Sequence, residues 1–458
     1  MSRFFHGQSV PTHFELNNLI HLYWSDPPSS SHPALARQGS IALATFISAG
    51  FDEQSVPLHR SRGCTARDRQ LQQRHFSKEI HMRFLNRERR ALDEFCPGLD
   101  SALASVPLAE LERPESIGLK EFKSAGGPAL VVPVEHAGPG ADAVQAVRVQ
   151  RAIASRSPSL AIATNMHHFS VASLVESNTR TNGLEWMLLE AIARDGLLVA
   201  SGFAEGRTGQ AILSPTMHAN VRDGKVVLNG RKKPCSLAHS MDLLTASITL
   251  PDEDGHGETM AVALVPKGTP GMTVRPFWNS FVLAGAESEE VVLTDVEIPM
   301  DLVVRTEARA DNRLDELQTT GFLWFELLMT ASYIGVASAL VERVLAAEKA
   351  DPAMRAELLV EIESAMATVE GVAAGMAHGH RGEQAFADAL ICRYAAQDVI
   401  GRVARRSVES LGGMAYVSSS DVAYLAAASA ALAFHPPSRS RMAQPLCDYF
   451  AGEPLQVG

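Results

Sequence analysis

A histidine near the end of the chain is the first residue whose type and setting could support chemistry. The stretch AFHPPSRSR, residues 433–441, follows an alanine-rich run and places His435 directly before two prolines. Imidazole titrates near neutral pH, so this side chain could abstract or shuttle a proton. Proline stops a helix, so the same histidine could equally be a structural residue in a proline-fixed turn. The residue types alone leave both interpretations open.

A single glutamate inside a long apolar run is the second candidate. Residues 322–341, FLWFELLMTASYIGVASALV, are about as long as a membrane-spanning helix, but they contain Glu326 and several hydroxyl side chains. We favour a buried bundle helix, because neither a second span nor a flanking basic cluster accompanies the run. Beside Trp324 and Phe325, the carboxyl group would have a raised pKa, as a general base needs, or would pair with an arginine such as Arg343.

The histidines and cysteines do not suggest a metal site. His167 and His168 are adjacent, so they point to different faces of a helix, which argues against a two-histidine site. The five cysteines are widely spaced and lack CxxC or CxxH pairing, so neither a disulfide framework nor a zinc site is indicated. We predict reduced thiols and no bound metal.

Composition limits the class of protein. The chain has 458 residues, a hydrophobic content of 46% and a net charge of −11. Such acidity argues against nucleic acid as a main partner, since phosphate binding needs a concentrated basic face. The first residues show no basic segment followed by an apolar core and a cleavage site, so we expect no secretion signal. These features predict a cytoplasmic enzyme that does not reside in a membrane.

Periodicity divides the chain into four parts: an unassigned extension (1–80), an N-terminal helical domain (81–190), a middle β domain (191–308) and a C-terminal helical bundle (309–458). Strand-like runs rich in β-branched residues, separated by Asp-Gly, Asn-Gly and other turn signals at hairpin spacing, mark the β domain. Helical periodicity on both sides predicts an antiparallel bundle at the C-terminus. We therefore predict an α+β fold that is mainly α.

Five landmarks in this order resemble those of the acyl-CoA dehydrogenase superfamily. They are PALVVPVEHAGPGAD (128–142), GFAEGRTGQ (202–210), VVLNGRKKPCSLAHSMDLL (226–244), VVLTDVEIPMDLVV (291–304) and VESLGGMAYVSSSDVAYL (408–425). The resemblance covers about residues 85–447. It implies an α-helical domain, a middle β domain and a C-terminal four-helix bundle, assembled as a homodimer or homotetramer with FAD at the subunit interface.

The resemblance assigns several residues to the flavin. Ser236 takes the place of the hydroxyl that hydrogen-bonds the N5 side of the flavin ring. Glu205 falls on the glutamate of the TEPGAGSD loop, in which Thr208 or Gln210 would supply further contacts. The two glycines of the family's pyrophosphate motif are Gly412 and Gly413, and glycine lets a backbone approach a phosphate closely.

The standard reaction of the family needs a carboxylate. Removal of the α-proton of an acyl thioester, as hydride leaves the β-carbon for flavin, requires a base. Alignment from the double glycine places His435 where most members carry that glutamate. Glu326 lies within one residue of the base position of isovaleryl-type members. The resemblance therefore implies oxidation of an acyl thioester, bound to CoA or a carrier protein, with His435 or Glu326 as base and a separate electron acceptor.

Two other activities remain open. Dibenzothiophene monooxygenase-like members end in a similar turn, use O2 and reduced flavin supplied by a reductase, and place a histidine near the flavin. A flavin-free descendant that binds an acyl thioester is the third alternative, since the family's usual arginine has no counterpart here. For the substrate, His168 follows the helix that often lines the channel, and Arg439 could hold the phosphates of CoA or phosphopantetheine.

Overall fold

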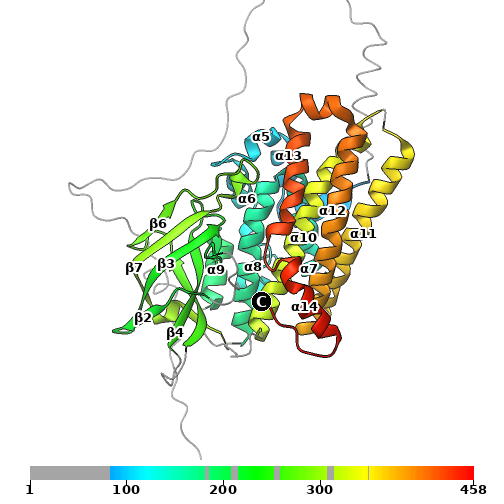
Figure 1. Cartoon of the computed structure of the whole chain (residues 1–458). Coiled ribbons are helices and arrows are strands. Elements are labelled where there is room, and N and C mark those ends of the chain that lie inside the picture. The colour runs from blue at the N-terminus through cyan, green and yellow to red at the C-terminus, as the bar shows by residue number, and fades with distance from the viewer. Residues whose placement is uncertain are drawn as a thin grey trace, which may run out of the picture. The chain divides into compact units, whose positions relative to one another are not determined.

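Helices from both ends of the described chain pack together beside a β domain in the computed structural model (Figure 1). The structure describes residues 83–180, 185–207, 215–251, 258–306, 314–348 and 350–457, and the predicted extension lies outside them. The residues from Phe84 onward belong to one unit with a shared core. Its first helices are α3 (Asn86–Phe95), α4 (Leu99–Ala104), α5 (Leu108–Leu111), α6 (Gly118–Ser124), α7 (Ala143–Arg156), α8 (Pro158–Arg180) and α9 (Glu185–Asp195).

Local chemistry sets the ends of the long helices in this first part. Asp142 and Gln145 form a capping box at the start of α7, in which each side chain accepts a hydrogen bond from the other residue's backbone N–H. Pro158 begins α8, because proline has no N–H to lose at the first turn of a helix. The boundary between α7 and α8 therefore lies at this proline.

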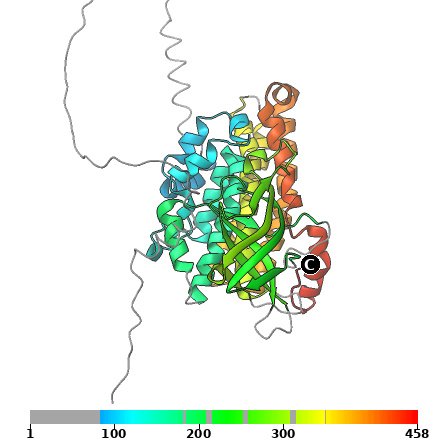
Figure 2. The same ribbon diagram turned by 90° about the vertical axis from the view of Figure 1, so that its left-hand side faces the viewer.

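The β domain consists of two four-stranded sheets. One sheet has the order β1 (Val199–Gly202), β4 (Leu243–Pro251), β5 (Glu258–Pro266) and β8 (Val303–Arg305), and the other has β2 (Ala219–Arg222), β3 (Lys225–Cys235), β7 (Glu289–Pro299) and β6 (Met272–Arg275). The pairs are antiparallel except for β1 with β4. Figure 2 shows these strands in front of the helices.

Of the signals Asp223-Gly224 and Asn229-Gly230, the first makes a hairpin and the second does not. Asp223 and Gly224 both have positive φ and connect β2 to β3, as expected for a tight turn. Asn229-Gly230 instead lies within β3, where the pairing with β7 shifts register. A Cβ on Gly230 would lie 2.5 Å from Cε of Met217, so the glycine permits close packing at a bulge. The prediction of a hairpin turn there was wrong.

The C-terminal helices pack around one central helix. They are α10 (Glu316–Ala346), α11 (Pro352–Ala377), α12 (Glu383–Ser418), α13 (Ser420–Ser429) and α14 (Arg439–Phe450). In Figure 1, α10 lies among α7, α8, α11, α12 and α13, and contacts between elements agree with this view. α10 is long and apolar enough to cross a bilayer, but 94% of its most apolar window is buried inside the fold. Its apolar surface therefore serves internal packing, as predicted.

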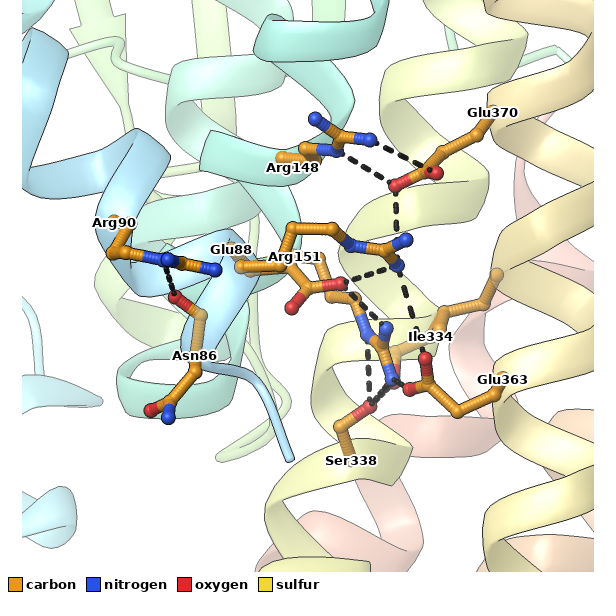
Figure 3. Close-up of polar contacts among 10 residues, drawn as sticks. Asn86, Glu88, Arg90, Arg148, Arg151, Ile334, Ser338, Glu363 and Glu370 are labelled. Atoms are coloured by element: carbon orange, nitrogen blue, oxygen red, sulfur yellow. Dashed lines mark hydrogen bonds and ion pairs between the residues drawn. The ribbon is translucent and has the colours of Figure 1, made fainter. Parts of the chain in front are cut away.

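A buried ionic cluster joins both helical parts (Figure 3). Arg151 of α7 is fully buried and donates to Glu88 of α3 at 2.8 Å, to Ser338 of α10 and to Glu363 of α11. Burial opposes the ionisation of Glu88, yet Arg151 and Arg87 together hold the pKa of its carboxyl below the usual range. This pairing ties four helices together at one point.

Candidate active site

A cavity of about 370 Å³ lies between the β domain and the helices. Its walls come from α8, α10, the strands around β1 and β3, and the turn that follows α13. Most of the lining side chains are apolar, and hydroxyl groups and one imidazole supply polar atoms. This volume and lining are typical of sites for small molecules and cofactors. We call it the central cavity.

His435 lines the central cavity and is held by a phenol. The 3-10 helix η5 (Ala430–Phe434) ends at His435, and Nε2 of the ring lies 2.8 Å from the hydroxyl oxygen of Tyr333 on α10. Tyr333 is fully buried, and its hydroxyl has no other hydrogen-bond partner among the described residues. A buried O–H needs an acceptor, so Tyr333 donates to Nε2 and the proton of the neutral ring lies on Nδ1.

The imidazole of His435 is neutral at ordinary pH. Burial lowers its pKa to about 3, and the nearby charge of Arg393 acts in the same direction. Nδ1 has no hydrogen-bond partner within the described parts of the chain and is not fully enclosed by protein. His435 can therefore offer an N–H donor to a molecule in the central cavity, whereas its capacity as a base is weak.

Glu326 does not face the central cavity. Both of its carboxylate oxygens accept hydrogen bonds from Nη1 of Arg393 on α12, at 2.9 and 2.8 Å, and both side chains are buried. Burial raises the pKa of Glu326 to about 7, with Arg393 opposing that shift. The sequence correctly indicated an arginine partner, although it suggested Arg343, which instead pairs with Asp421. Because the carboxylate is turned toward Arg393, the geometry gives no support to Glu326 as a base.

Ser236 lies in the wall of the central cavity at the end of β3. Its hydroxyl is 3.0 Å from that of Ser288, and both residues line the cavity together with the indole of Trp278. The apolar walls suit a flat aromatic ring, and two hydroxyls can bond to polar atoms at its edge. The cavity therefore suits the ring of a flavin, and Ser236 lies in its wall, while a contact between Ser236 and flavin stays a prediction.

The carboxylate of Glu205 makes its hydrogen bonds within the β domain. Its carboxylate accepts a 2.8 Å hydrogen bond from the buried amine of Lys232, and bonds from the backbone N–H of Thr216. It is not among the residues that line the central cavity. The other predicted residues of this loop, Thr208 and Gln210, lie outside the described residues.

The double glycine lies in another part of the bundle. Gly412 has a φ of 81° and interrupts the regular geometry of α12, and neither it nor Gly413 has a neighbouring atom where a Cβ would lie. The central cavity contains neither residue in its lining. Gly412 and Gly413 are therefore not placed to contact a flavin bound in the central cavity of the same chain.

The two adjacent histidines have structural surroundings. Nε2 of His167 lies 2.9 Å from the carbonyl oxygen of Pro128, and Nδ1 accepts from the N–H of Val199 at 3.0 Å, so its proton lies on Nε2. His168 is fully buried beside Phe122, and neither ring nitrogen has a partner in the described structure. Since His168 does not line the central cavity, the predicted substrate contact is not formed there.

The side chain of Arg439 forms contacts on the surface of the bundle. Its guanidinium pairs with Asp398 at 3.0 Å and donates to the carbonyl oxygen of Tyr394. It lines neither the central cavity nor the polar hollow at the start of α10. The predicted role in phosphate binding is therefore not supported by its contacts.

Sequence reasoning missed four residues that shape the site: Tyr333, Arg393, Trp278 and Ser288. One signal was present for Tyr333, because it follows Glu326 by seven residues and so shares its side of the helix. The other three come from distant segments of the chain, and only the folded structure brings them to the cavity or to its supporting turn.

Comparison with known proteins agrees with this architecture. The family model of the acyl-CoA dehydrogenase middle domain matches residues 200–296. Isobutylamine N-hydroxylase of Streptomyces viridifaciens is 45% identical over 379 residues, which are 82% of this chain and 100% of the relative. The chain belongs to the acyl-CoA dehydrogenase-like flavoprotein superfamily. The predicted family and fold class are thus confirmed.

Solved structures of this superfamily show the same fold. FMN-bound TdsC from Paenibacillus sp. A11-2 superposes with a TM-score of 0.70 at 18% identity, covering 80% of this chain and 98% of that chain. A nitrososynthase from Micromonospora carbonacea var. africana gives a TM-score of 0.67 at 19% identity, covering 80% and 96%. The relatives include this N-hydroxylase and dibenzothiophene monooxygenase of Rhodococcus erythropolis, so they support the alternative of a flavin-dependent monooxygenase better than oxidation of an acyl thioester.

Proposed function

We propose that this chain is a flavin-dependent monooxygenase that hydroxylates the nitrogen of a small aliphatic amine. The observation that carries the proposal is 45% identity over the full length of a relative named isobutylamine N-hydroxylase. The expected alternative of a monooxygenase thus replaces acyl-thioester oxidation as the leading interpretation.

The site chemistry supports this choice. Dehydrogenation of a thioester needs a base of suitable pKa within reach of the substrate. Of the described residues that line the central cavity, His435 alone has an ionisable ring or acid group, and it is neutral with a lowered pKa. Glu326 is turned away and paired with Arg393. A donor of the His435 type suits a reaction in which oxygen gains negative charge.

The overall reaction balances without a further oxidant. One amine, one O2 and one reduced flavin give one hydroxylamine, one water and one oxidised flavin. Reduced flavin, when bound, supplies two electrons to O2 and passes one oxygen atom to the nitrogen. The amine gains an N–O bond and keeps one of its two N–H bonds.

The residues of this chain would orient and protect the reactants. The Nδ1–H of His435 would donate to an oxygen atom held in the central cavity, and Tyr333 would keep the ring in that tautomer. Ser236 and Ser288 would bond to the edge of the flavin ring. The apolar walls would exclude water, which limits the loss of reducing equivalents as hydrogen peroxide.

The proposed cofactor is reduced flavin delivered by a separate reductase. FAD was the cofactor expected from the family, whereas solved structures of TdsC and of KijD3 contain bound FMN. Both flavins therefore belong in the first experiment, together with a flavin reductase as the partner protein.

Product analysis tests the proposal. The protein is supplied with a flavin reductase, FMN or FAD, air and isobutylamine, and N-hydroxylated amine is measured by mass spectrometry. A parallel reaction contains oxidised flavin, an artificial electron acceptor and a panel of acyl-CoA thioesters. We expect hydroxylamine in the first reaction and no enoyl-CoA in the second. Enoyl-CoA without hydroxylamine, or failure to bind flavin in either oxidation state, would overturn the proposal.

A further inference from the structure

We propose that Arg393 is a positioning residue for His435, and that Glu326 holds Arg393 in place for this purpose. The inference deepens the proposed function and rests on it in one respect: the task of His435 in the reaction. The contacts themselves form a continuous buried path from α10 through α12 to the turn that carries the imidazole.

Arg393 binds the backbone of that turn at three carbonyl groups. Nη2 donates to the carbonyl oxygens of Leu432, at 3.3 Å, and of His435, while Nη1 donates to that of Pro436 at 3.2 Å. The next residue of α12 also binds this turn, since the hydroxyl of Tyr394 donates to the carbonyl oxygen of Pro437 at 2.9 Å.

The carbonyl groups of His435 and Pro436 need partners because the helix ends here, whereas that of Leu432 also accepts from the N–H of His435 at 3.4 Å. The last carbonyls of a helix lack intrahelical donors, and two prolines supply no N–H groups of their own. A guanidinium presents several N–H donors in a fixed planar arrangement, so one arginine can satisfy carbonyls that a lysine cannot serve together. Arg393 therefore matches what the end of η5 requires.

Packing holds only part of the turn. Leu432 is fully buried, whereas the side chain of Phe434, directly before His435, is 82% exposed. Arg393, by contrast, is 1% exposed, and its charge is balanced by the fully buried Glu326. Because water is excluded around this pair, the contacts of the guanidinium are strong and directional.

The imidazole is thereby fixed at two points. Arg393 holds the backbone carbonyl of His435, and Tyr333 holds Nε2 of the ring. Together these contacts determine where Nδ1 lies in the central cavity. Errors of about 1 Å in the position of a reacting group can cost about a hundredfold in rate, so both contacts matter for the proposed reaction.

The first test uses Arg393→Lys, which keeps the positive charge beside Glu326 but cannot reach all three carbonyls. We expect amine hydroxylation to fall by about tenfold to a hundredfold with little change in KM, and hydrogen peroxide release to rise. If Arg393 acts through His435, then Arg393→Lys combined with His435→Ala is no slower than His435→Ala alone. Multiplying losses in the double variant would overturn the inference.

The second test requires neither flavin nor turnover. Backbone amide exchange of the peptide covering 432–441 is followed by mass spectrometry in the protein without flavin. Arg393→Lys should accelerate exchange in this peptide and leave the β domain unchanged. Unchanged exchange at 432–441 would overturn the inference even if hydroxylation falls. If wild-type protein makes no hydroxylamine, the proposed function fails, and this readout still decides whether Arg393 orders the turn.

Two further variants keep the tests decisive. Arg148→Lys changes another arginine of the helical region, paired with Glu370 at 2.9 Å, and should leave exchange at 432–441 unchanged. Tyr394→Phe removes one hydrogen bond to the same turn, and it serves if Arg393→Lys does not fold. It should accelerate exchange at 432–441 less than Arg393→Lys does. Unchanged exchange in Tyr394→Phe would show that the hydrogen bond to Pro437 does not stabilise the turn.

Discussion

The phenol of Tyr333 and the imidazole of His435 are joined by a hydrogen bond of 2.8 Å, between residues that are 102 positions apart in the chain. This contact fixes which ring nitrogen carries the proton, because the buried phenol has to donate. It turns a histidine that resembled a base into a neutral donor facing the central cavity.

Removal of the phenol hydroxyl should weaken this arrangement. In Tyr333→Phe the ring stays packed, but Nε2 loses its donor and the Nδ1–H tautomer is no longer enforced. We expect hydroxylation to fall by about tenfold, as for loss of one buried hydrogen bond. His435→Ala should cost more, about a hundredfold or above. Steady-state hydroxylamine formation measures both, and full activity of His435→Ala would refute the assigned donor.

The lowered pKa of His435 predicts the shape of the pH profile. The imidazole has an ordinary pKa of 6.5 and a value of about 3 in the fold, so it stays unprotonated between those values. The rate of hydroxylation by the wild type should therefore show no change near pH 6.5 that depends on His435, and His435→Gln should have a pH profile of the same shape. A limb there in the wild type, lost in this variant, would show that the ring titrates normally.

Two other buried histidines predict acid sensitivity of the fold. Burial lowers the pKa of His167 to about 4 and that of His168 well below 6.5, so the unfolded chain takes up protons first as the pH falls below 6.5. Stability should decline in that range, by up to about 1.4 kcal/mol per pH unit for each histidine. Urea unfolding at several pH values measures the decline.

One variant assigns part of that decline to a buried ring. His168→Leu removes one titrating ring and two nitrogens without partners in the described structure, and should make stability depend less steeply on pH. Equal slopes in this variant and in the wild type would contradict the assignment.

Glu326→Gln separates a structural role from a catalytic one. The change leaves the buried charge of Arg393 without its counterion, and breaking a buried pair in this way costs about 3–5 kcal/mol. We expect a clear loss in the free energy of unfolding. A variant as stable as the wild type, yet without turnover of any substrate, would restore Glu326 as a base.

The ionic cluster around Arg151 predicts a second large effect on stability. Arg151→Met removes the buried partner of the Glu88 carboxylate and leaves it the half-exposed Arg87 at 3.1 Å, so it should destabilise the fold by about 3 kcal/mol. Arg148→Met removes a pair that is partly open to solvent and should cost clearly less. Urea unfolding compares the two variants, and similar losses would argue against a special role for the buried cluster.

Flavin binding tests the wall at the end of β3. Ser236→Ala removes a hydroxyl that bonds to Ser288 and lines the central cavity. Affinity for flavin should fall by about tenfold, measured by quenching of flavin fluorescence on titration. Ser236→Thr retains the hydroxyl and serves as the control. Equal affinity in Ser236→Ala would remove this residue from the cofactor site.

Much of the fold was accessible from the sequence because periodicity reports which faces are buried. The apolar run of α10 is a local pattern, and it was correctly predicted to form a buried bundle helix. Asn229-Gly230 was wrongly predicted to form a turn, because its glycine is needed for close packing against Met217. The dipeptide looks the same in the sequence whether the glycine is needed for a turn or for packing.

The site was less accessible, since its chemistry depends on distant contacts. His435 and Ser236 were placed by resemblance, and both line the central cavity. The prediction of Glu326 as a base did not foresee Arg393, which lies 67 residues away and pairs with its carboxylate. The protonation of His435 likewise depends on Tyr333, and no pattern around the histidine announces that partner.

Transfer of an oxygen atom is the central claim, and isotopically labelled O2 tests it most directly. The protein is given reduced flavin, isobutylamine and labelled O2, and the product is analysed by mass spectrometry. The proposed reaction predicts a hydroxylamine that carries one labelled oxygen atom on nitrogen. Release of the label only as hydrogen peroxide, with the amine unchanged, would contradict N-hydroxylation of this amine.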